Sequence, residues 1–196
     1  MTTQPNIVAA DLFCGAGGLT AGLERSGIDV RLAVDLDEDC RHPIRANTKA
    51  EFLKADVAHL SSSEVVRRFD NHEEKSIKLL AGCAPCQPFS TYSRAAKRSG
   101  GTRRGRGKSD DWKLVDRFGE IVEEVGPDLV TMENVPPLAD QEVFHSLLER
   151  LEGYWVDHAV VQCRMVGLPQ TRKRLVLLAS RLGPIKVPEF DRPEKS

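Results

Sequence analysis

The chain has 196 residues, and 28 lysines and arginines against 29 aspartates and glutamates leave a formal net charge of −1. With 40% hydrophobic and 29% charged residues, it is typical of a globular protein and not of a disordered chain. No apolar run approaches the roughly 20 residues of a membrane span, and no basic region precedes the apolar stretch near the N-terminus. We therefore expect a cytoplasmic protein without a membrane partner, and the chain is long enough to bury a hydrophobic core.

Short apolar runs alternate with stretches of helical periodicity along the chain. They predict strands over residues 7–11, 30–34, 77–81, 129–132, 154–161 and 175–179, and helices over residues 19–25, 112–125 and 143–151. Strands that alternate with helices predict an α/β fold around a mostly parallel sheet. In such sheets ligands bind at the carboxyl ends of the strands, near the point where the strand order reverses.

Polar and glycine-rich segments fall at the ends of these strands. The turn 11–18, Asp-Leu-Phe-Cys-Gly-Ala-Gly-Gly, has glycines that let a ligand approach the backbone, although glycine-rich turns after strands are common. Asp35 ends the next strand, where a carboxylate accepts hydrogen bonds from ribose hydroxyls; the alternative is a surface residue in the acidic run 35–39. Further signals at strand ends are Asp56, the segment 83–90, Glu133 and Asn134. We expect these loops to form one site.

The five cysteines are Cys14, Cys40, Cys83, Cys86 and Cys163, an odd number that favours free thiols in a reducing compartment. Cys83 and Cys86 form a CxxC pair, a spacing found in zinc sites and redox centres. We expect neither a metal site nor a redox pair, because the other cysteines are scattered and prolines surround the motif. Cys86, in a tight loop just after Pro85, is instead a candidate nucleophile if its surroundings are electropositive.

A basic stretch follows Cys86 in the sequence. Between Arg94 and Lys108 there are seven basic residues, four glycines and no acidic residue. One interpretation is a solvated loop, and the other is a flexible arm that neutralises the phosphates of a nucleic acid. We expect a mobile loop over about residues 91–111, whose positive charge also favours the thiolate of Cys86.

Four segments, in this order and at these spacings, resemble the conserved blocks of the cytosine-5 DNA methyltransferases: residues 11–20, Pro85-Cys86-Gln87, Glu133-Asn134-Val135 and Gln170-x-Arg172-x-Arg174. The resemblance covers about residues 6–181. It implies the Rossmann-like fold of S-adenosylmethionine-dependent methyltransferases, an α/β fold whose mostly parallel sheet has an antiparallel C-terminal strand. It also implies an enzyme that transfers a methyl group from S-adenosylmethionine to C5 of cytosine in double-stranded DNA, leaving S-adenosylhomocysteine.

The resemblance also implies roles for single residues. Cys86 matches the nucleophile that adds to C6 of a cytosine flipped out of the base stack. Glu133 matches the carboxyl group that engages N3; it must carry a proton to donate there, so we expect burial to raise its pKa. Asn134 matches a residue that holds the nucleophile loop. Arg172 and Arg174 match the arginine pair near the flipped nucleotide, and Arg174 is the better match for a partner of Glu133.

Ten residues match the cofactor pocket: Asp11, Phe13, Gly15, Gly17, Leu19, Asp35, Leu36, Asp56, Val57 and Pro85. Leu36 departs from the family pattern, because an aromatic residue often follows the ribose-binding acid. Cys83 has no matching role, and we expect it, like Cys14, to be a packed thiol.

The family's target-recognition region and last two conserved blocks have no counterpart in these 196 residues. We therefore expect residues 1–196 to be an incomplete catalytic and cofactor-binding domain that needs a complementary half, with a second polypeptide as one source. The resemblance implies a restriction-modification methylase of a prokaryotic cell, associated with the nucleoid when on DNA. Two alternatives remain open: an inactive regulatory module that keeps the fold, and a cytosine-5 methyltransferase acting on RNA.

Overall fold

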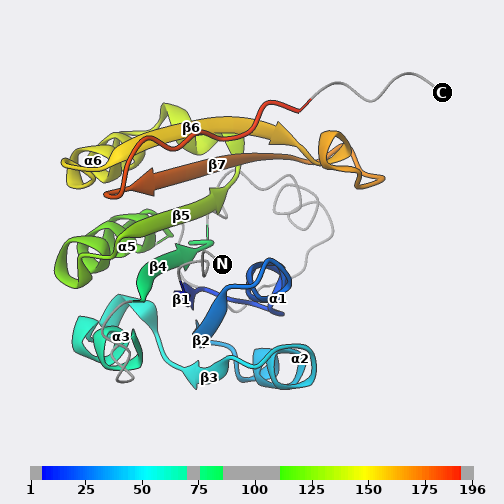
Figure 1. Cartoon of the computed structure of the whole chain (residues 1–196), viewed down its shortest axis with the longest axis vertical. Helices are drawn as coiled ribbons and strands as arrows, with labels where there is room; N and C mark the ends of the chain where they lie inside the picture. Colours follow the sequence, from blue (N-terminus) through cyan, green and yellow to red (C-terminus); the bar gives the residue numbers. More distant parts are fainter. Residues whose placement is uncertain (1–5, 70–75, 86–110, 191–196) are drawn as a thin grey trace, which may run out of the picture.

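A computed structural model describes residues 6–69, 76–85 and 111–190 of the chain. Its centre is a seven-stranded sheet with the strand order β3-β2-β1-β4-β5-β7-β6 (Figure 1). The strands are β1 (Ile7–Leu12), β2 (Asp29–Asp35), β3 (Glu51–Lys54), β4 (Ile77–Gly82), β5 (Leu129–Asn134), β6 (Trp155–Gln162) and β7 (Lys173–Ser180).

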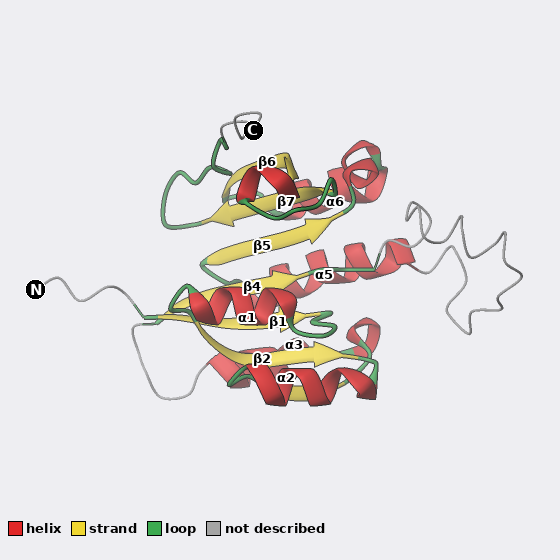
Figure 2. Cartoon of the chain, turned by 90° about the vertical axis from the view of Figure 1, so that its right-hand side faces the viewer, coloured by secondary structure: helices red, strands yellow, loops and turns green. Residues whose placement is uncertain are grey.

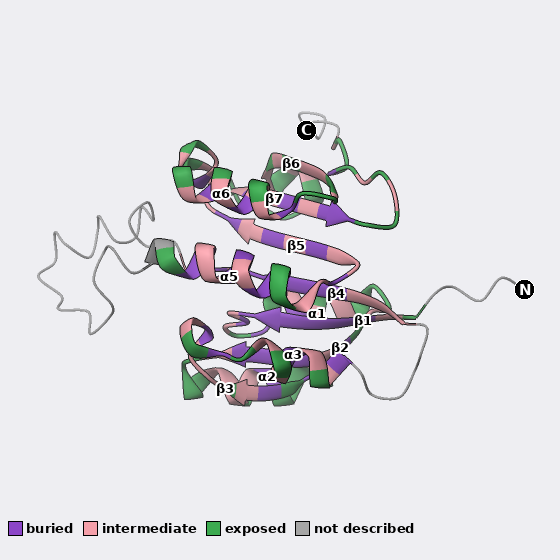
Figure 3. Ribbon diagram, turned by 90° about the vertical axis from the view of Figure 1, so that its left-hand side faces the viewer, coloured by how far each residue is buried: buried purple, intermediate pink, exposed green. Residues whose placement is uncertain are grey.

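Helices lie on both faces of this sheet. They are α1 (Gly18–Arg25), α2 (Arg41–Asn47), α3 (Ser62–Phe69), α5 (Asp111–Val125) and α6 (Glu142–Arg150). Figure 2 shows α1 and α2 in front of one face, and Figure 3 shows α3, α5 and α6 in front of the other. Within the described ranges, no helix has the length and apolar character needed to cross a membrane.

The predicted sheet is confirmed, including its antiparallel C-terminal strand. The five strands from β3 to β5 pair in parallel, whereas β7 runs antiparallel to both β5 and β6. The chain leaves β1 towards β2 on one side, and β4 leads to β5 on the other. The strand order therefore reverses between β1 and β4, and their carboxyl ends open the crevice in which α/β sheets bind ligands.

Two hydrophobic cores hold the layers together. The larger lies under α3, α5 and α6, and its biggest side chains include Phe69, Phe118 and Phe144, each at most 2% exposed. The smaller lies under α1 and α2 and contains Ile44 and Phe52. Both cores rest on the period-two alternation of the strands, which sends successive side chains to opposite faces.

The segment between residues 38 and 69 differs from the sequence prediction, which had no element there. It contains α2, β3 and α3. β3 has only four residues, of which Phe52 alone is buried, and Pro43 lies inside the seven-residue α2. Such short elements carry too little periodicity to be recognised, and contacts with the rest of the sheet define them.

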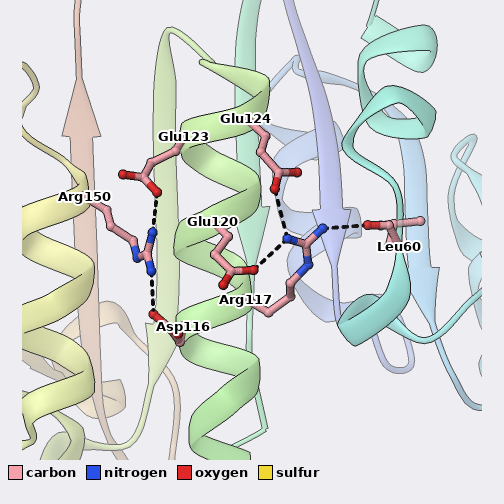
Figure 4. A network of polar contacts seen from close by, with 7 residues as sticks. All are labelled: Leu60, Asp116, Arg117, Glu120, Glu123, Glu124 and Arg150. Atoms are coloured by element: carbon pink, nitrogen blue, oxygen red, sulfur yellow. Dashed lines mark hydrogen bonds and ion pairs between the residues drawn. The ribbon is translucent and has the colours of Figure 1, made fainter.

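α5 is fastened to its neighbours by two arginines (Figure 4). Arg117 donates to the Leu60 carbonyl oxygen at 2.9 Å and to Glu120 at 2.7 Å. Arg150 of α6 reaches back to α5, where it pairs with Asp116 and Glu123. These contacts fix the helix that directly follows residues 86–110, which lie outside the described residues.

Candidate active site

The glycine-rich turn after β1 is built around left-handed backbone. Phe13, Gly15 and Gly17 have φ values of 61°, 52° and 87°. A Cβ on Gly17 would lie 2.6 Å from Cδ1 of Ile44 and would displace that side chain of α2, and the φ of 87° at Gly17 is itself strained for any other residue. A Cβ on Gly15 would meet no atom within 4 Å, so this glycine instead leaves open space along the backbone. Of the two glycines, Gly15 is therefore the one with open space beside its backbone.

Asp35, the last residue of β2, accepts two backbone hydrogen bonds. Its Oδ2 accepts from the Gly15 N–H at 2.9 Å, and its Oδ1 accepts from the Asp37 N–H at 2.9 Å. Asp35 therefore ties the glycine-rich turn to the end of the neighbouring strand, which argues against a merely solvated carboxylate. Leu36 beside it is 53% exposed, and Leu19 in the first turn of α1 is half-buried.

Asp56 begins the short turn that follows β3. Its Oδ1 accepts from the Ala58 N–H at 3.0 Å, and its Oδ2 lies 3.5 Å from Nδ1 of His59. The Ala55 N–H donates to the Asp35 carbonyl oxygen at 3.0 Å, so the loops after β2 and β3 are joined. Val57 is 2% exposed and packs into the larger core, so its side chain faces away from solvent.

Asp11, the next-to-last residue of β1, is completely buried. Its Oδ2 accepts from the Thr20 hydroxyl of α1 at 2.6 Å, while its Oδ1 has no partner among the described residues. Burial raises the pKa of Asp11 to about 6, and the neighbouring charge of Asp35 acts in the same direction. Asp11 thus links β1 to α1 across the glycine-rich turn. Its partner Thr20 was not identified from the sequence.

The end of β5 holds the segment that leads to Cys86. Asn134 is 4% exposed; its Nδ2 donates to the Ala84 carbonyl oxygen at 2.9 Å, and its Oδ1 accepts from the Val135 N–H at 2.8 Å. Pro85 is half-buried beside this contact. Cys86 itself and the basic stretch predicted for about residues 91–111 lie outside the described residues, except for the start of α5.

Glu133 forms an ion pair with Arg174, the second residue of β7. Burial raises the pKa of Glu133, although Arg174, Cys83 and Arg172 each act to lower it. The expected rise in the pKa of Glu133 is therefore confirmed. Arg172 is exposed just before β7, and its backbone carbonyl oxygen accepts from the Cys163 N–H at 2.8 Å.

The structure brings most of the residues singled out in the sequence to one edge of the sheet. Asp11, Asp35 and Glu133 are at or near the carboxyl ends of three parallel strands, and Asp56 follows a fourth. Arg174 reaches the same edge because β7 runs antiparallel to β5, with Glu133 opposite Val176. Glu133 and Asn134 are part of β5 itself, because they pair with β7 beyond the predicted end of β5. Arg174 is part of β7, because it pairs with Val161 of β6 before the predicted start of β7.

The sequence was compared with known protein families, and it matches the C-5 cytosine-specific DNA methylase model over residues 7–196. The chain belongs to this family. Type II methylase M.HgiDII of Herpetosiphon aurantiacus is 37% identical over 190 residues, which are 94% of this chain and 50% of the relative. Type II methyltransferase M.XorII of Xanthomonas oryzae pv. oryzae is 33% identical, covering 97% of this chain and 44% of the relative.

Solved structures agree on the fold. The Entamoeba histolytica methyltransferase EhMeth superimposes with a TM-score of 0.71 at 21% identity, over 98% of this chain and 58% of that one. The chain thus has the methyltransferase fold, and it spans about half the length of the curated relatives it matches.

Proposed function

We propose that this chain is the catalytic and cofactor-binding part of a DNA cytosine-5 methyltransferase that takes its methyl group from S-adenosylmethionine. The supporting observation is the pairing of Glu133, whose pKa is raised, with Arg174 at the sheet edge from which the Cys86 segment departs. A carboxyl group that is protonated more readily than usual suits donation to a ring nitrogen. Family membership supports the same activity.

The described residues fit S-adenosylmethionine. Gly15 leaves open space beside the backbone, Asp35 is fixed at the adjacent strand end for ribose hydroxyls, and Asp56 follows on the next strand. Exposed Leu36 offers an apolar surface beside Asp35, and the buried Asp11 supports the turn. When bound, the cofactor would supply an electrophilic methyl group on a positively charged sulfur, which the nearby carboxylates favour.

Cys86 is the proposed nucleophile. Its thiolate forms a bond to C6 of the cytosine, and the electron pair of the C5–C6 double bond moves towards C5 and N3. Protonated Glu133 donates to N3, which stabilises the charge that develops in the ring. C5 then forms its bond to the methyl group, whose bond to the donor sulfur would break to leave S-adenosylhomocysteine. A base removes the C5 proton, the C6–S bond breaks to restore the C5–C6 double bond and the thiolate, and N3 returns its proton to Glu133.

The remaining residues position this chemistry. Asn134 hydrogen-bonds Ala84, two residues before Cys86, and so fixes the chain where the segment that carries Cys86 begins. Arg174 orients Glu133, and we assign the exposed Arg172 to a phosphate or to the flipped nucleotide. The seven basic residues between Arg94 and Lys108 are proposed to neutralise phosphates of double-stranded DNA, from which the cytosine is flipped.

We further propose that a complementary half, in the same or a second polypeptide, completes the enzyme. α1 and α2 lie over β1 to β3, whereas Figure 2 shows in front of β7 and β6 the short 3-10 helix Cys163–Val166 and, within the described ranges, no α-helix. Val176 and Leu178 of β7 point to this face and are only half-buried. Trp155, at the outer end of edge strand β6, is 57% exposed. This apolar surface suits coverage by a further folded segment.

The last described segment leads towards this face. The Val187 N–H donates to Oδ2 of Asp157 at 2.8 Å, and Val187 is 8% exposed. Asp157 is opposite Leu178, on the face of β6 turned away from α6, whereas the next residue, His158, packs edge-on against Phe144 of α6. Residues 181–190 therefore cross β6 where the complementary half is proposed to dock.

A duplex that contains 5-fluorocytosine tests the proposed function. Fluorine at C5 cannot leave as a proton, so the adduct between Cys86 and C6 would accumulate once the methyl group has been transferred. The chain should be supplied with the part of M.HgiDII that it does not match, together with S-adenosylmethionine. We expect a denaturation-resistant protein–DNA band that Cys86→Ser abolishes. A band that persists in the variant, or adducts on an RNA competitor instead of DNA, would contradict the proposal.

A further inference from the structure

Cys83, which has no role in the proposed reaction, lies against Glu133. It directly follows β4, and the pairing of Gly82 with Met132 brings the next residues of the two strands side by side. This places the Cys83 thiol beside the Glu133 carboxyl group, and each side chain influences the pKa of the other. The backbone N–H of Cys83 in turn donates to the Leu12 carbonyl oxygen at 3.2 Å, so its position is fixed from β1 as well.

The Cys83 thiol is in the protonated form that can donate. Burial raises the pKa of Cys83 well above its ordinary value, and the charges of Glu133 and Asp11 raise it further. The sulfur therefore keeps its proton across the physiological range, so the thiol is able to donate a hydrogen bond to the neighbouring carboxyl group. Glu133 is thus contacted by Arg174 from β7 and by Cys83 from the end of β4.

We propose that Cys83 is a positioning residue for Glu133, whose carboxyl group it holds in one orientation opposite Arg174. This proposal depends on the proposed function in one respect, namely that Glu133 is the group that contacts the cytosine base. It replaces our expectation that Cys83 is merely a packed thiol. Cys83 acts through Glu133 and touches neither DNA nor cofactor.

A thiol suits this position because it is a weak donor. The hydrogen bond stabilises the carboxylate form of Glu133 less than a hydroxyl would, so burial still raises the pKa of Glu133 despite Arg174 and Arg172. A serine would orient Glu133 equally well but would favour its ionised form. Cysteine combines orientation with a carboxyl group that is readily protonated.

The direct test is a pH titration of the 196-residue chain with ¹³C-labelled glutamate side chains, followed by NMR, with Glu133→Gln used to assign the signal. The midpoint of Glu133 should be highest in Cys83→Ala, which lacks the donor, and lowest in Cys83→Ser, which has a stronger one. Cys40→Ala is the matched control. This half-buried thiol contacts Asp35 and not Glu133, so the titration midpoint of Glu133 should not change. Equal Glu133 midpoints in the alanine and serine variants would overturn the proposal.

A reciprocal measurement covers the case in which a Cys83 variant folds poorly. If the two groups are coupled, Glu133→Gln removes a negative charge beside Cys83, lowers the pKa of the thiol and speeds its alkylation at fixed pH. Peptide mapping should find faster labelling of Cys83 but unchanged labelling of Cys163. Unchanged labelling of Cys83 would count against the coupling. Neither experiment needs DNA, cofactor or activity, so a failure here is distinct from a failure of the proposed methylation.

Discussion

Glu133 and Arg174 belong to adjacent antiparallel strands, and their ion pair joins the end of β5 to the start of β7. Burial nevertheless raises the pKa of Glu133. The arginine therefore orients the carboxyl group without forcing it to remain ionised. This combination is what a proton donor to a ring nitrogen requires.

Glu133→Gln should reduce methylation by the completed enzyme roughly 100-fold or more, because an amide cannot deliver a proton to N3. The measurement is the single-turnover rate of methyl transfer, since binding of DNA should change little. Glu152→Gln, at an exposed position after α6, is the matched control and should be silent. Comparable rates in the parent and in Glu133→Gln would remove Glu133 from the mechanism.

Cys86→Ser should abolish turnover while leaving the fold intact, because an alcohol is a far poorer nucleophile than a thiolate. Cys83→Ser should retain most of the activity, because serine still orients Glu133, although by favouring the ionised carboxylate it should lower the rate modestly. Methyl transfer and circular dichroism of both variants provide the comparison. If Cys83 proved essential and Cys86 dispensable, the nucleophile would be misassigned.

Asp35→Ala should weaken the binding of S-adenosylmethionine by about tenfold or more, which corresponds to about 1.4 kcal/mol. The substitution removes the proposed acceptor for the ribose hydroxyls. It also removes the carboxylate oxygen to which the Gly15 N–H donates. Titration calorimetry with the chain alone is the measurement. Asp29→Ala, an exposed acid at the other end of β2, is the control and should bind like the parent. Tight binding that Asp35→Ala does not alter would contradict the cofactor assignment.

Asp11 predicts a pH dependence of stability. Its pKa is raised from an ordinary 3.8 to about 6 in the folded chain, so the folded state binds the proton more tightly than the unfolded state. The favourable contribution of the protonated form is complete below the unfolded pKa and is lost as the pH rises through about 6. Asp11→Asn removes this titration.

Urea unfolding of the parent and Asp11→Asn at several pH values measures the effect. The stability of the variant relative to the parent should increase by about 2 kcal/mol between about pH 4.5 and 7. The asparagine amide also lowers the free energy of unfolding, because its buried polar atoms replace the Asp11 Oδ1 that had no partner among the described residues. That loss does not vary with pH. A stability difference that is constant across the range would mean that Asp11 is not protonated near pH 6.

Gly119 predicts a packing constraint between α5 and α6. A Cβ there would lie 2.7 Å from Cδ of Arg150 and 3.2 Å from Cδ1 of the buried Leu147. Gly119→Ala should therefore lower the free energy of unfolding by about 1–2 kcal/mol, despite the better helix propensity of alanine. Gly22→Ala in α1 meets no atom within 4 Å and should be stabilising. Thermal unfolding of both variants tests the pair, and stabilisation by Gly119→Ala would refute the constraint.

The α/β class, most of the strands and the gathering of acidic residues at one edge of the sheet were predictable from the sequence. Strands such as β1 and β4 are buried on both faces and therefore read as apolar runs. The glycine-rich turn and the acids that follow the strands are recognisable because each lies next to such a run. The prediction of the antiparallel strand and the role proposed for Glu133 came from the family resemblance instead.

Only the tertiary structure decided which side chains touch. Thr20 binds Asp11 across nine residues, Asn134 binds Ala84 across fifty, and Cys83 meets Glu133 from a neighbouring strand. The spacing of residues along the chain does not encode contacts of this kind, because strand order and register determine them. The pKa values of Asp11 and Glu133 likewise depend on burial, which exists only once the sheet and its helices have packed together.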